Sequence, residues 1–269
     1  MPSATSQRVF LPSINELWRC RWLVSNLAAR NLKARYRQSV LGLAWHIVSP
    51  LLTMTILTIL FAGIMAASLQ GRSFALYVIT GLLPWSLFSA ASSQGLVSIT
   101  GSHSIIRKVY VPKIVFPLSA VLSSYVGFGL SLIPLAIIMI AVGARFSWAL
   151  LFALIPTLEI ALFSLGISMV LATAHVFFRD IRWFYDSALL AGFYITPIFY
   201  TPEVVGSEYM RFLKLNPLFP MIRAFRSPIV YGVMPDWSDL LAGAAASLIA
   251  LLLGWTVVHN YDQRVLNHL

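Results

Sequence analysis

Long apolar stretches without any charged residue run through this chain, and short polar segments separate them. Residues 38–71, 73–106, 114–144 and 240–261 contain no lysine, arginine, aspartate or glutamate. A helix needs about 20 apolar residues to cross the hydrocarbon layer of a bilayer. Because the stretches are continuously apolar rather than alternating, they predict membrane-spanning helices and not the strands of a barrel.

Six crossings fit this pattern, which predicts an all-α, polytopic membrane protein. The predicted spans are residues 42–65, 74–96, 114–142, 148–177, 184–200 and 240–258. They form a six-span bundle over residues 42–258, and residues 1–269 as a whole are interpreted as a single transmembrane domain. Too few residues lie outside the spans to form a soluble domain.

Composition and charge agree with a membrane protein of defined orientation. The chain is 59% hydrophobic and only 10% charged, with a net charge of +10 and a single cysteine, Cys20, which excludes an internal disulfide framework. Most of the 19 lysines and arginines fall on the side of the N-terminus if the spans alternate. The positive-inside rule therefore predicts a multi-pass protein of the cytoplasmic membrane, with residues 1–38 and 259–269 in the cytoplasm. The orientation of the protein in the membrane explains its positive net charge, so a nucleic-acid partner is not needed to explain it.

Residues 1–38 are predicted to contain an amphipathic helix that lies along the membrane surface. Ser13 followed by Glu16 forms a capping-box pattern at its start. At helical spacing one side carries Ile14, Leu17, Trp18, Trp22, Ala28, Leu32 and Tyr36, and another carries Arg19, Arg30, Lys33 and Arg37. The basic side suits either a simple topology anchor or the binding of lipid phosphate.

Two further segments lie between spans and are not apolar enough to cross. Residues 101–113 form a short cytoplasmic loop that Pro112 closes, and they act either as a docking helix for another protein or as a plain connector. Residues 201–237 are external and predict two short amphipathic helices broken at Asn216 and Pro217. Their apolar content predicts that they fold back to cap the bundle as a re-entrant pair.

Several chemistries are missing from the sequence. No glycine-rich loop ends in Gly-Lys-Ser/Thr, so the chain does not bind ATP by that route. The five histidines are scattered, and no paired carboxylates share a span, which argues against a metal site or an embedded hydrolase. Glu159 is the one central acid. It is either a polar contact in a conduit or subunit interface, or a carboxyl bonded to a neighbouring threonine or serine.

Aromatic residues are concentrated in the fifth predicted span and beside the others. Most are expected to pack or to form the interfacial belt, while some could line a conduit for sugars, because an aromatic face contacts the C–H surface of a sugar and leaves it mobile.

A set of short motifs resembles the membrane subunit of ABC transporters that export polysaccharides such as O-antigen, capsule and teichoic acid. The resemblance covers nearly the whole chain. The motifs, in chain order, are Arg35-Tyr36-Arg37-Gln38-Ser39-Val40-Leu41-Gly42 with Trp45 and Pro50, Gly81-Leu82-Leu83-Pro84-Trp85, Arg107-Lys108 with Pro112, Phe116-Pro117, Arg179-Asp180-Ile181, Thr196-Pro197-Ile198-Phe199-Tyr200 and Asn216-Pro217-Leu218.

The resemblance implies partners and a division of labour. A second copy of the chain would form a homodimer with a channel at its interface, joined to two copies of a separate ATPase that holds ATP and magnesium. The chain itself would bind no cofactor and would catalyse nothing. Its cargo would be a polysaccharide linked to a polyprenyl diphosphate.

The same resemblance implies roles for particular residues. The loop would be the coupling helix, with contacts from His103, Ile106, Arg107, Lys108 and Tyr110. The diphosphate headgroup would be attracted by Arg30, Lys33, Arg35 and Arg37. The channel would be lined by Trp45, Phe193, Tyr194 and Tyr200, and the 201–237 pair would form the external gate.

Two other functions remain open at this point. One is an ABC permease that exports a drug or a small lipid, since the sugar cargo rests mainly on aromatic content. The other is a membrane enzyme acting on lipid-linked sugars, which would need a catalytic carboxylate or histidine cluster.

Overall fold

The computed structural model describes residues 18–36, 39–65, 69, 71–108, 111–144, 146–204 and 206–268. In these ranges the chain is helical, and no strand is assigned within them. The helices are α2 (Arg21–Tyr36), η1 (Gly42–Ala44), α3 (Trp45–Met65), α4 (Phe74–Leu96), η3 (Thr100–Ser102), α5 (His103–Ile106), α6 (Val115–Val142), η4 (Trp148–Ala153), α7 (Leu154–Phe177), α8 (Ile181–Ile195), η5 (Pro202–Val204), α9 (Ser207–Leu215), α10 (Leu218–Arg226), η6 (Ser227–Tyr231) and α11 (Trp237–His268).

Within the described ranges, five helical segments are long and apolar enough to cross a membrane. They are Gly42–Met65, Phe74–Leu96, Val115–Val142, Trp148–Phe177 and Trp237–Tyr261. The all-α membrane fold and five of the predicted spans are thereby confirmed, to within a few residues at each end.

The fifth predicted span, residues 184–200, corresponds to a shorter helix. α8 has 15 residues and ends at Ile195. At 1.5 Å per residue it is about 22 Å long, less than the roughly 30 Å of a hydrocarbon core. Pro197 explains the early end, because a proline disfavours helical geometry in the residue before it. Thr196 is accordingly extended, with ψ of 132°.

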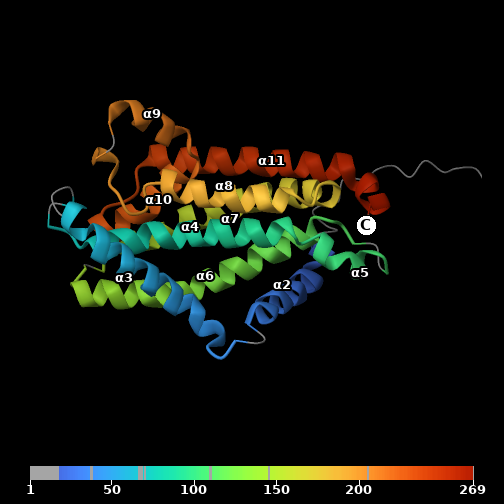
Figure 1. Cartoon of the computed structure of the whole chain (residues 1–269), viewed down its shortest axis with the longest axis horizontal. Coiled ribbons are helices and arrows are strands. Elements are labelled where there is room, and N and C mark those ends of the chain that lie inside the picture. The colour runs from blue at the N-terminus through green and yellow to red at the C-terminus, as the bar shows by residue number, and fades with distance from the viewer. Residues whose placement is uncertain are drawn as a thin grey trace, which may run out of the picture.

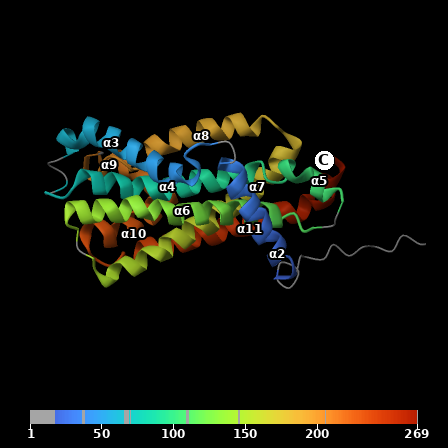
Figure 2. The same ribbon diagram turned by 90° about the horizontal axis from the view of Figure 1, so that it is seen from below.

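The long helices lie side by side, and the short elements gather at the two ends of the bundle (Figures 1 and 2). α5 and the C-terminal part of α11 lie at one end, with the start of α2 close by. α9 and α10 lie at the other end. The residues between the spans are thus sorted into two separate surfaces, which we call the α5 end and the α10 end.

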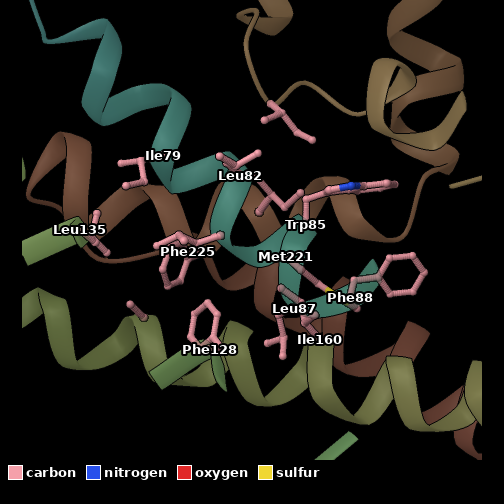
Figure 3. Packing of buried hydrophobic residues seen from close by; sticks show 14 of the residues in the cluster. Ile79, Leu82, Trp85, Leu87, Phe88, Phe128, Leu135, Ile160, Met221 and Phe225 are labelled. Carbon is pink, nitrogen blue, oxygen red and sulfur yellow. The ribbon is translucent and has the colours of Figure 1, made fainter. Parts of the chain in front are cut away.

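α4 is the central helix, and most of its residues are buried. It packs against α6 and α7, and α10 closes one end of the same core. Figure 3 shows this core, in which Trp85 and Phe88 of α4 lie near Ile160 of α7 and Met221 of α10. α8, by contrast, has no buried residue and lies at the periphery.

α2 packs against α6 through short aliphatic side chains. Val24, Leu27 and Ala28 are buried, whereas Trp18 and Trp22 are about 70% exposed. The sequence predicted an interfacial helix with both tryptophans on its apolar side, and it did not predict which side contacts the bundle. Short aliphatic side chains allow the helix to lie close to the bundle, and the bulky indoles remain outside. The guanidinium of Arg21 lies 5.3 Å and 5.9 Å from the two indole rings, a cation–π arrangement typical of a membrane interface.

Candidate functional site

One face of α4 is polar and only partly covered. Ser86, Ser89, Ser93 and Gln94 are half-buried on a helix that is otherwise mostly buried. At 100° per residue these positions fall on one side of the helix. A polar stripe on the central helix of an apolar bundle needs water or a polar ligand beside it.

Three hollows adjoin this face. A hollow of about 280 Å³ lies between α3, α4 and α6, and one of about 490 Å³ lies between α4 and α8. A third, of about 350 Å³, lies where α2 crosses the ends of α4 and α6. The first two share Ser86 and Ala90, and the last two share Gln94 and Val97. We call the three together the α4 groove.

The α4 groove offers hydroxyl and amide groups. Gln94 donates from Nε2 to Ser124 Oγ at 2.6 Å, and Ser89 donates from Oγ to the carbonyl of Ser86 at 3.3 Å. A serine that donates to its own helix keeps lone pairs that can accept from a ligand. Such a surface can make many weak, exchangeable hydrogen bonds, which suits a sliding polyol better than a tightly held substrate.

Among the described residues that line the groove, the charged side chains lie toward the α5 end. Arg30 of α2 lines the third hollow, and Arg182 and Asp186 of α8 line the second. Arg182 and Asp186 form an exposed ion pair with a 4.0 Å separation. An anion entering from the α5 end therefore meets Arg30 before it reaches the uncharged serines.

The other end of the groove is formed where α3 approaches α6. Trp45 and His46 line the first hollow, and Ser131 donates to the carbonyl of His46 at 3.1 Å. A Cβ on Gly127 would lie only 2.5 Å from Cε1 of the His46 ring. Glycine at position 127 thus leaves room for the His46 ring where the two helices approach each other.

The four aromatic residues predicted to line a channel lie in two places. Trp45 lines the α4 groove, and its indole N–H donates to Ser39 Oγ at 3.1 Å. Phe193 belongs to an aromatic cluster, with its ring 6.0 Å from Trp85, 5.5 Å from Tyr194 and 6.0 Å from Phe199. The Tyr200 hydroxyl donates to the carbonyl of Ile195 at 2.6 Å. The last three predicted residues therefore lie beside the groove and not on its wall.

Sequence reasoning missed the serines of α4. The signal was present, because Ser86, Ser89 and Ser93 stand at helical spacing in a span without charges. Threonine and serine are common in membrane helices as packing residues. The spacing alone therefore does not show whether these serines line a polar groove or pack against a neighbouring helix. The hollows beside them make that distinction.

At the α10 end, Arg226 ties three segments together. This buried arginine donates from Nη2 to the carbonyls of Pro197 and Ile198, at 3.1 Å and 3.3 Å. Its guanidinium lies 3.7 Å from the centroid of the Tyr77 ring. Asn216 donates to Thr196 Oγ1 at 2.9 Å. The turn after α8 is therefore fixed to both α4 and the break between α9 and α10.

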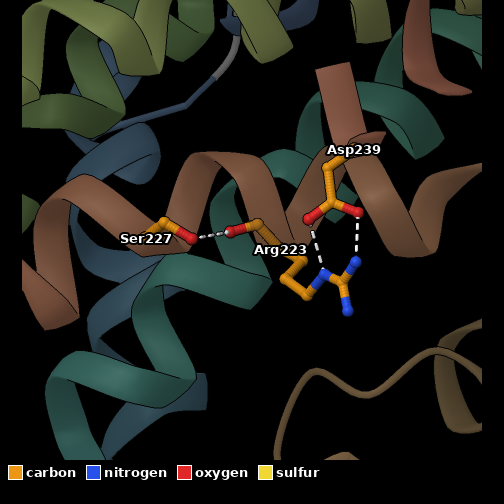
Figure 4. A network of polar contacts seen from close by, with 3 residues as sticks. All are labelled: Arg223, Ser227 and Asp239. Carbon is orange, nitrogen blue, oxygen red and sulfur yellow. Dashed lines mark hydrogen bonds and ion pairs between the residues drawn. The ribbon is translucent and has the colours of Figure 1, made fainter. Parts of the chain in front are cut away.

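A second arginine joins α10 to the last span. Arg223 donates from Nε and Nη2 to the two carboxylate oxygens of Asp239, and Ser227 donates to the carbonyl of Arg223 (Figure 4). The hydrogen bonds that Arg223 donates to Asp239 raise the pKa of the guanidinium, because they favour its charged form. Asp239 is buried at the first turn of α11, and the pair fixes α10 over that helix.

In the described part of the predicted coupling segment, the short helix α5 follows the end of η3. His103, Arg107 and Lys108 are exposed, while Ile106 is buried in an apolar cluster that also contains Val24 and Leu27 of α2. Tyr110 lies outside the described residues. Thr100 Oγ1 and His175 Nδ1 are 3.2 Å apart, which ties the approach to α5 to the end of α7. α5 thus has an exposed polar side and an apolar side anchored in the bundle.

The predicted headgroup residues are only partly described. Arg30 and Lys33 are exposed on α2, and Arg30 lines the groove. The backbone of Arg35 belongs to the same helix, but its side chain and the whole of Arg37 lie outside the described residues.

The side chain of Glu159, on α7, is enclosed between α7 and α11 of the same chain. It does not line the α4 groove. It is buried, and its Oε2 atom has no hydrogen-bond partner among the described residues. The serine contact is to its backbone, since Ser247 Oγ donates to the Glu159 carbonyl at 2.8 Å. A Cβ on Gly243 would collide with the carboxylate, so that glycine makes room for it.

Across the ranges that the structure describes, no three histidine, cysteine, aspartate or glutamate side chains are grouped to hold a metal ion. The chemistry of the site is that of a polar path beside an apolar core.

Comparison with known proteins gives a consistent family. A family model described as ABC-2 type transporter matches residues 23–230. The chain is 31% identical over 254 residues to the O-antigen export system permease protein RfbA of Myxococcus xanthus, covering 93% of this chain and 95% of the relative. It is 34% identical over 208 residues to a protein of the same name from Klebsiella pneumoniae, covering 76% and 79%. It is 22% identical over 244 residues to the polysialic acid transport protein KpsM of Escherichia coli, covering 90% and 95%.

Proposed function

The chain belongs to the ABC-2 type transporter family, and from this premise we propose that it is the permease subunit of an ATP-driven polysaccharide exporter. The cargo is a polymer of the O-antigen, capsule or teichoic-acid type carried on a polyprenyl diphosphate. The observation that carries this proposal is similarity over nearly the full length to a permease named for O-antigen export. A permease subunit of this family is not itself catalytic.

The α4 groove is the part of the path that one chain contributes. Its serines and Gln94 supply exchangeable hydrogen bonds for sugar hydroxyls, and Trp45 supplies an aromatic face. The groove is open along one side, so a second copy is needed to close a conduit. We infer a homodimer in which the two α4 faces look toward one shared channel.

Energy comes from a separate subunit. Two copies of an ATPase, which bind ATP and magnesium, dock on the exposed side of α5. His103, Arg107 and Lys108 are the contacts on that side, and buried Ile106 transmits their movement to α2. Because one side of α5 contacts the ATPase and the other side packs in the bundle, a movement of the ATPase is transmitted to the bundle through α5.

The basic residues of α2 receive the lipid headgroup. Arg30 lies at the α5 end of the groove, so a diphosphate attracted there is placed where the attached sugar can enter. Lys33, Arg35 and Arg37 extend the positive charge along the membrane surface. The exposed Trp18 and Trp22 support a position of α2 at the interface.

We infer six crossings, with α8 and residues 196–200 together forming the fifth. α8 runs along the bundle between the two ends, which supports this assignment (Figure 1). Both termini then lie in the cytoplasm with α5, and α9 with α10 form the external gate of an inner-membrane protein.

The test is removal of the chain from its bacterial host. Cells without it should keep polyprenyl-linked polysaccharide on the cytoplasmic face, detected with a glycan-specific antibody that reaches it only in inside-out vesicles. An intact copy, expressed with the ATPase, should restore surface polymer, and an ATPase variant that cannot hydrolyse ATP should not. Normal surface polymer in the deletion strain would refute the proposal. Altered efflux of a small lipid or drug with unchanged polymer would instead favour the smaller cargo.

A further inference from the structure

An apolar slot lies between α6 and the η4–α7 segment, separate from the α4 groove. It has a volume of about 300 Å³. Its wall combines small residues, Gly129, Ala136 and Ala153, with the larger Leu132, Leu135 and Met139. Small residues beside large ones make a depression in a helix surface, and here that depression runs along α6.

The two hydroxyl groups at this slot already have partners. Tyr125 and Thr157 are 3.3 Å apart from oxygen to oxygen, and Thr157 also donates to the carbonyl of Leu154 at 2.8 Å. The rest of the lining is hydrocarbon. A water molecule needs two to four polar partners, so the slot does not suit water or a polar ligand.

The slot lies mostly within the depth of one leaflet. Along α6 it extends from Tyr125 to Met139, which is about 21 Å at 1.5 Å per residue. Half of a hydrocarbon core is about 15 Å thick. The slot therefore covers the half of α6 nearest the α10 end, which is the outer leaflet in the topology proposed above.

The surface around the slot faces lipid. Ile133 and Ile137 of α6 and Leu154 and Leu158 of α7 are all more than 40% exposed. All four lie in membrane spans, where exposed aliphatic side chains contact acyl chains.

The slot is too narrow for another helix. Its volume of about 300 Å³ is far smaller than a helix about 10 Å wide would fill over the same length. A narrow hydrocarbon chain fits this space better than a helix does.

From the length, width and lining we propose that this slot binds one acyl chain of an outer-leaflet phospholipid. The deep side of the slot is formed by Phe225 and Ile229, and the Phe225 ring meets that of Phe128 edge-on with centroids 6.2 Å apart (Figure 3). A chain in the slot thus packs directly against the end of α10. This inference depends on the chain spanning the membrane and not on the identity of the cargo.

Photolabelling tests the proposal. The full chain, with its ATPase, is reconstituted in vesicles of phosphatidylethanolamine and phosphatidylglycerol that contain phosphatidylethanolamine with a diazirine in the middle of one acyl chain. Peptide mapping should find residues 125–139 and 150–157 labelled at least threefold more strongly than the exposed side of α3. Uniform labelling of all lipid-facing helices would overturn the proposal.

Two glycine variants provide a matched pair. A Cβ on Gly129 or on Gly63 of α3 meets nothing within 4 Å, so Gly129→Leu and Gly63→Leu introduce the same side chain at two positions where the Cβ has open space. Gly129→Leu should fill the slot and lower its labelling at least threefold, whereas Gly63→Leu should leave it unchanged. Equal labelling in both variants would count against the slot, and the wild-type pattern remains informative if a variant fails to fold.

Two further experiments test whether another molecule fills the slot. Strong slot labelling by a diazirine-bearing polyprenyl phosphate, with none from the phospholipid, would show that the cargo lipid binds there and would overturn the assignment. A disulfide between two copies of Ala136→Cys, in a Cys20→Ser background, would show that a second chain covers the slot and would do the same.

Discussion

The guanidinium of Arg226 lies 3.7 Å from the centroid of the Tyr77 ring, and the Tyr77 hydroxyl donates to the carbonyl of Tyr200 at 3.0 Å. One arginine and one tyrosine thus join α10, α4 and the turn after α8. These three segments are far apart in the sequence. Because Arg226 is buried, its contacts replace the water that a charged group otherwise requires.

Replacing Arg226 should loosen this junction. Arg226→Met keeps much of the side-chain volume but leaves the carbonyls of Pro197 and Ile198 without a donor, which costs about 2–3 kcal/mol. We expect thermal denaturation in detergent to occur several degrees lower. Arg211→Met on α9 is the control, since Arg211 is exposed. Equal melting temperatures for the two variants would contradict this role.

The contact of α3 with α6 depends on Gly127. Gly127→Ala should destabilise the chain by about 1–3 kcal/mol, because the new methyl group overlaps the His46 ring. Gly129→Ala, two residues away, has open space and should be neutral. The double variant Gly127→Ala/His46→Ala should recover part of the loss, which a melting series in detergent can measure. Failure of the second substitution to help would argue against this clash.

The Arg223–Asp239 pair should contribute measurably although Arg223 is half-exposed. Asp239→Asn should cost about 1–2 kcal/mol, since solvent screens part of the interaction. Asp236→Asn removes an exposed carboxylate that acts on Arg223 only through its charge, and it should cost less than Asp239→Asn. A double-mutant cycle with Arg223→Ala measures the coupling of the pair, and a coupling energy near zero would exclude a stabilising role.

Charge reversal on α5 should separate ATP hydrolysis from transport. Arg107→Glu/Lys108→Glu changes two exposed residues at the proposed ATPase contact, and we expect surface polymer to fall at least tenfold while the chain still reaches the membrane. Arg211→Glu/Lys214→Glu makes the same charge change at the α10 end and should leave coupling intact. Unchanged ATP-dependent export in the α5 variant would remove α5 from the coupling path.

Apolar residues in the α4 groove should block the path without unfolding the bundle. Ser89→Leu/Ser93→Leu fills the half-buried polar face, and export should fall at least tenfold while ATP hydrolysis continues. Thr256→Leu, on the exposed side of α11, should export normally. Normal export by the serine variant would show that the polymer takes another route.

The sequence alone determined the spans and the breaks between them. Continuous apolar residues and the absence of charge fix where a chain can cross lipid, because each uncompensated charge in hydrocarbon costs several kcal/mol. Five spans were therefore predicted almost to the residue. The break at Asn216 and Pro217 was equally local, since α9 ends at Leu215 and α10 begins at Leu218.

Only the tertiary structure decided which side of each helix faces the protein core and which side faces lipid or the groove. In an apolar bundle, core and lipid-facing side chains look alike, so periodicity did not show that Trp22 is exposed while Leu27 is buried. The same ambiguity hid the serine face of α4 and left Glu159 with two interpretations. Packing decided where both lie: neighbouring helices leave Ser89 beside a hollow, and they enclose Glu159 against Gly243.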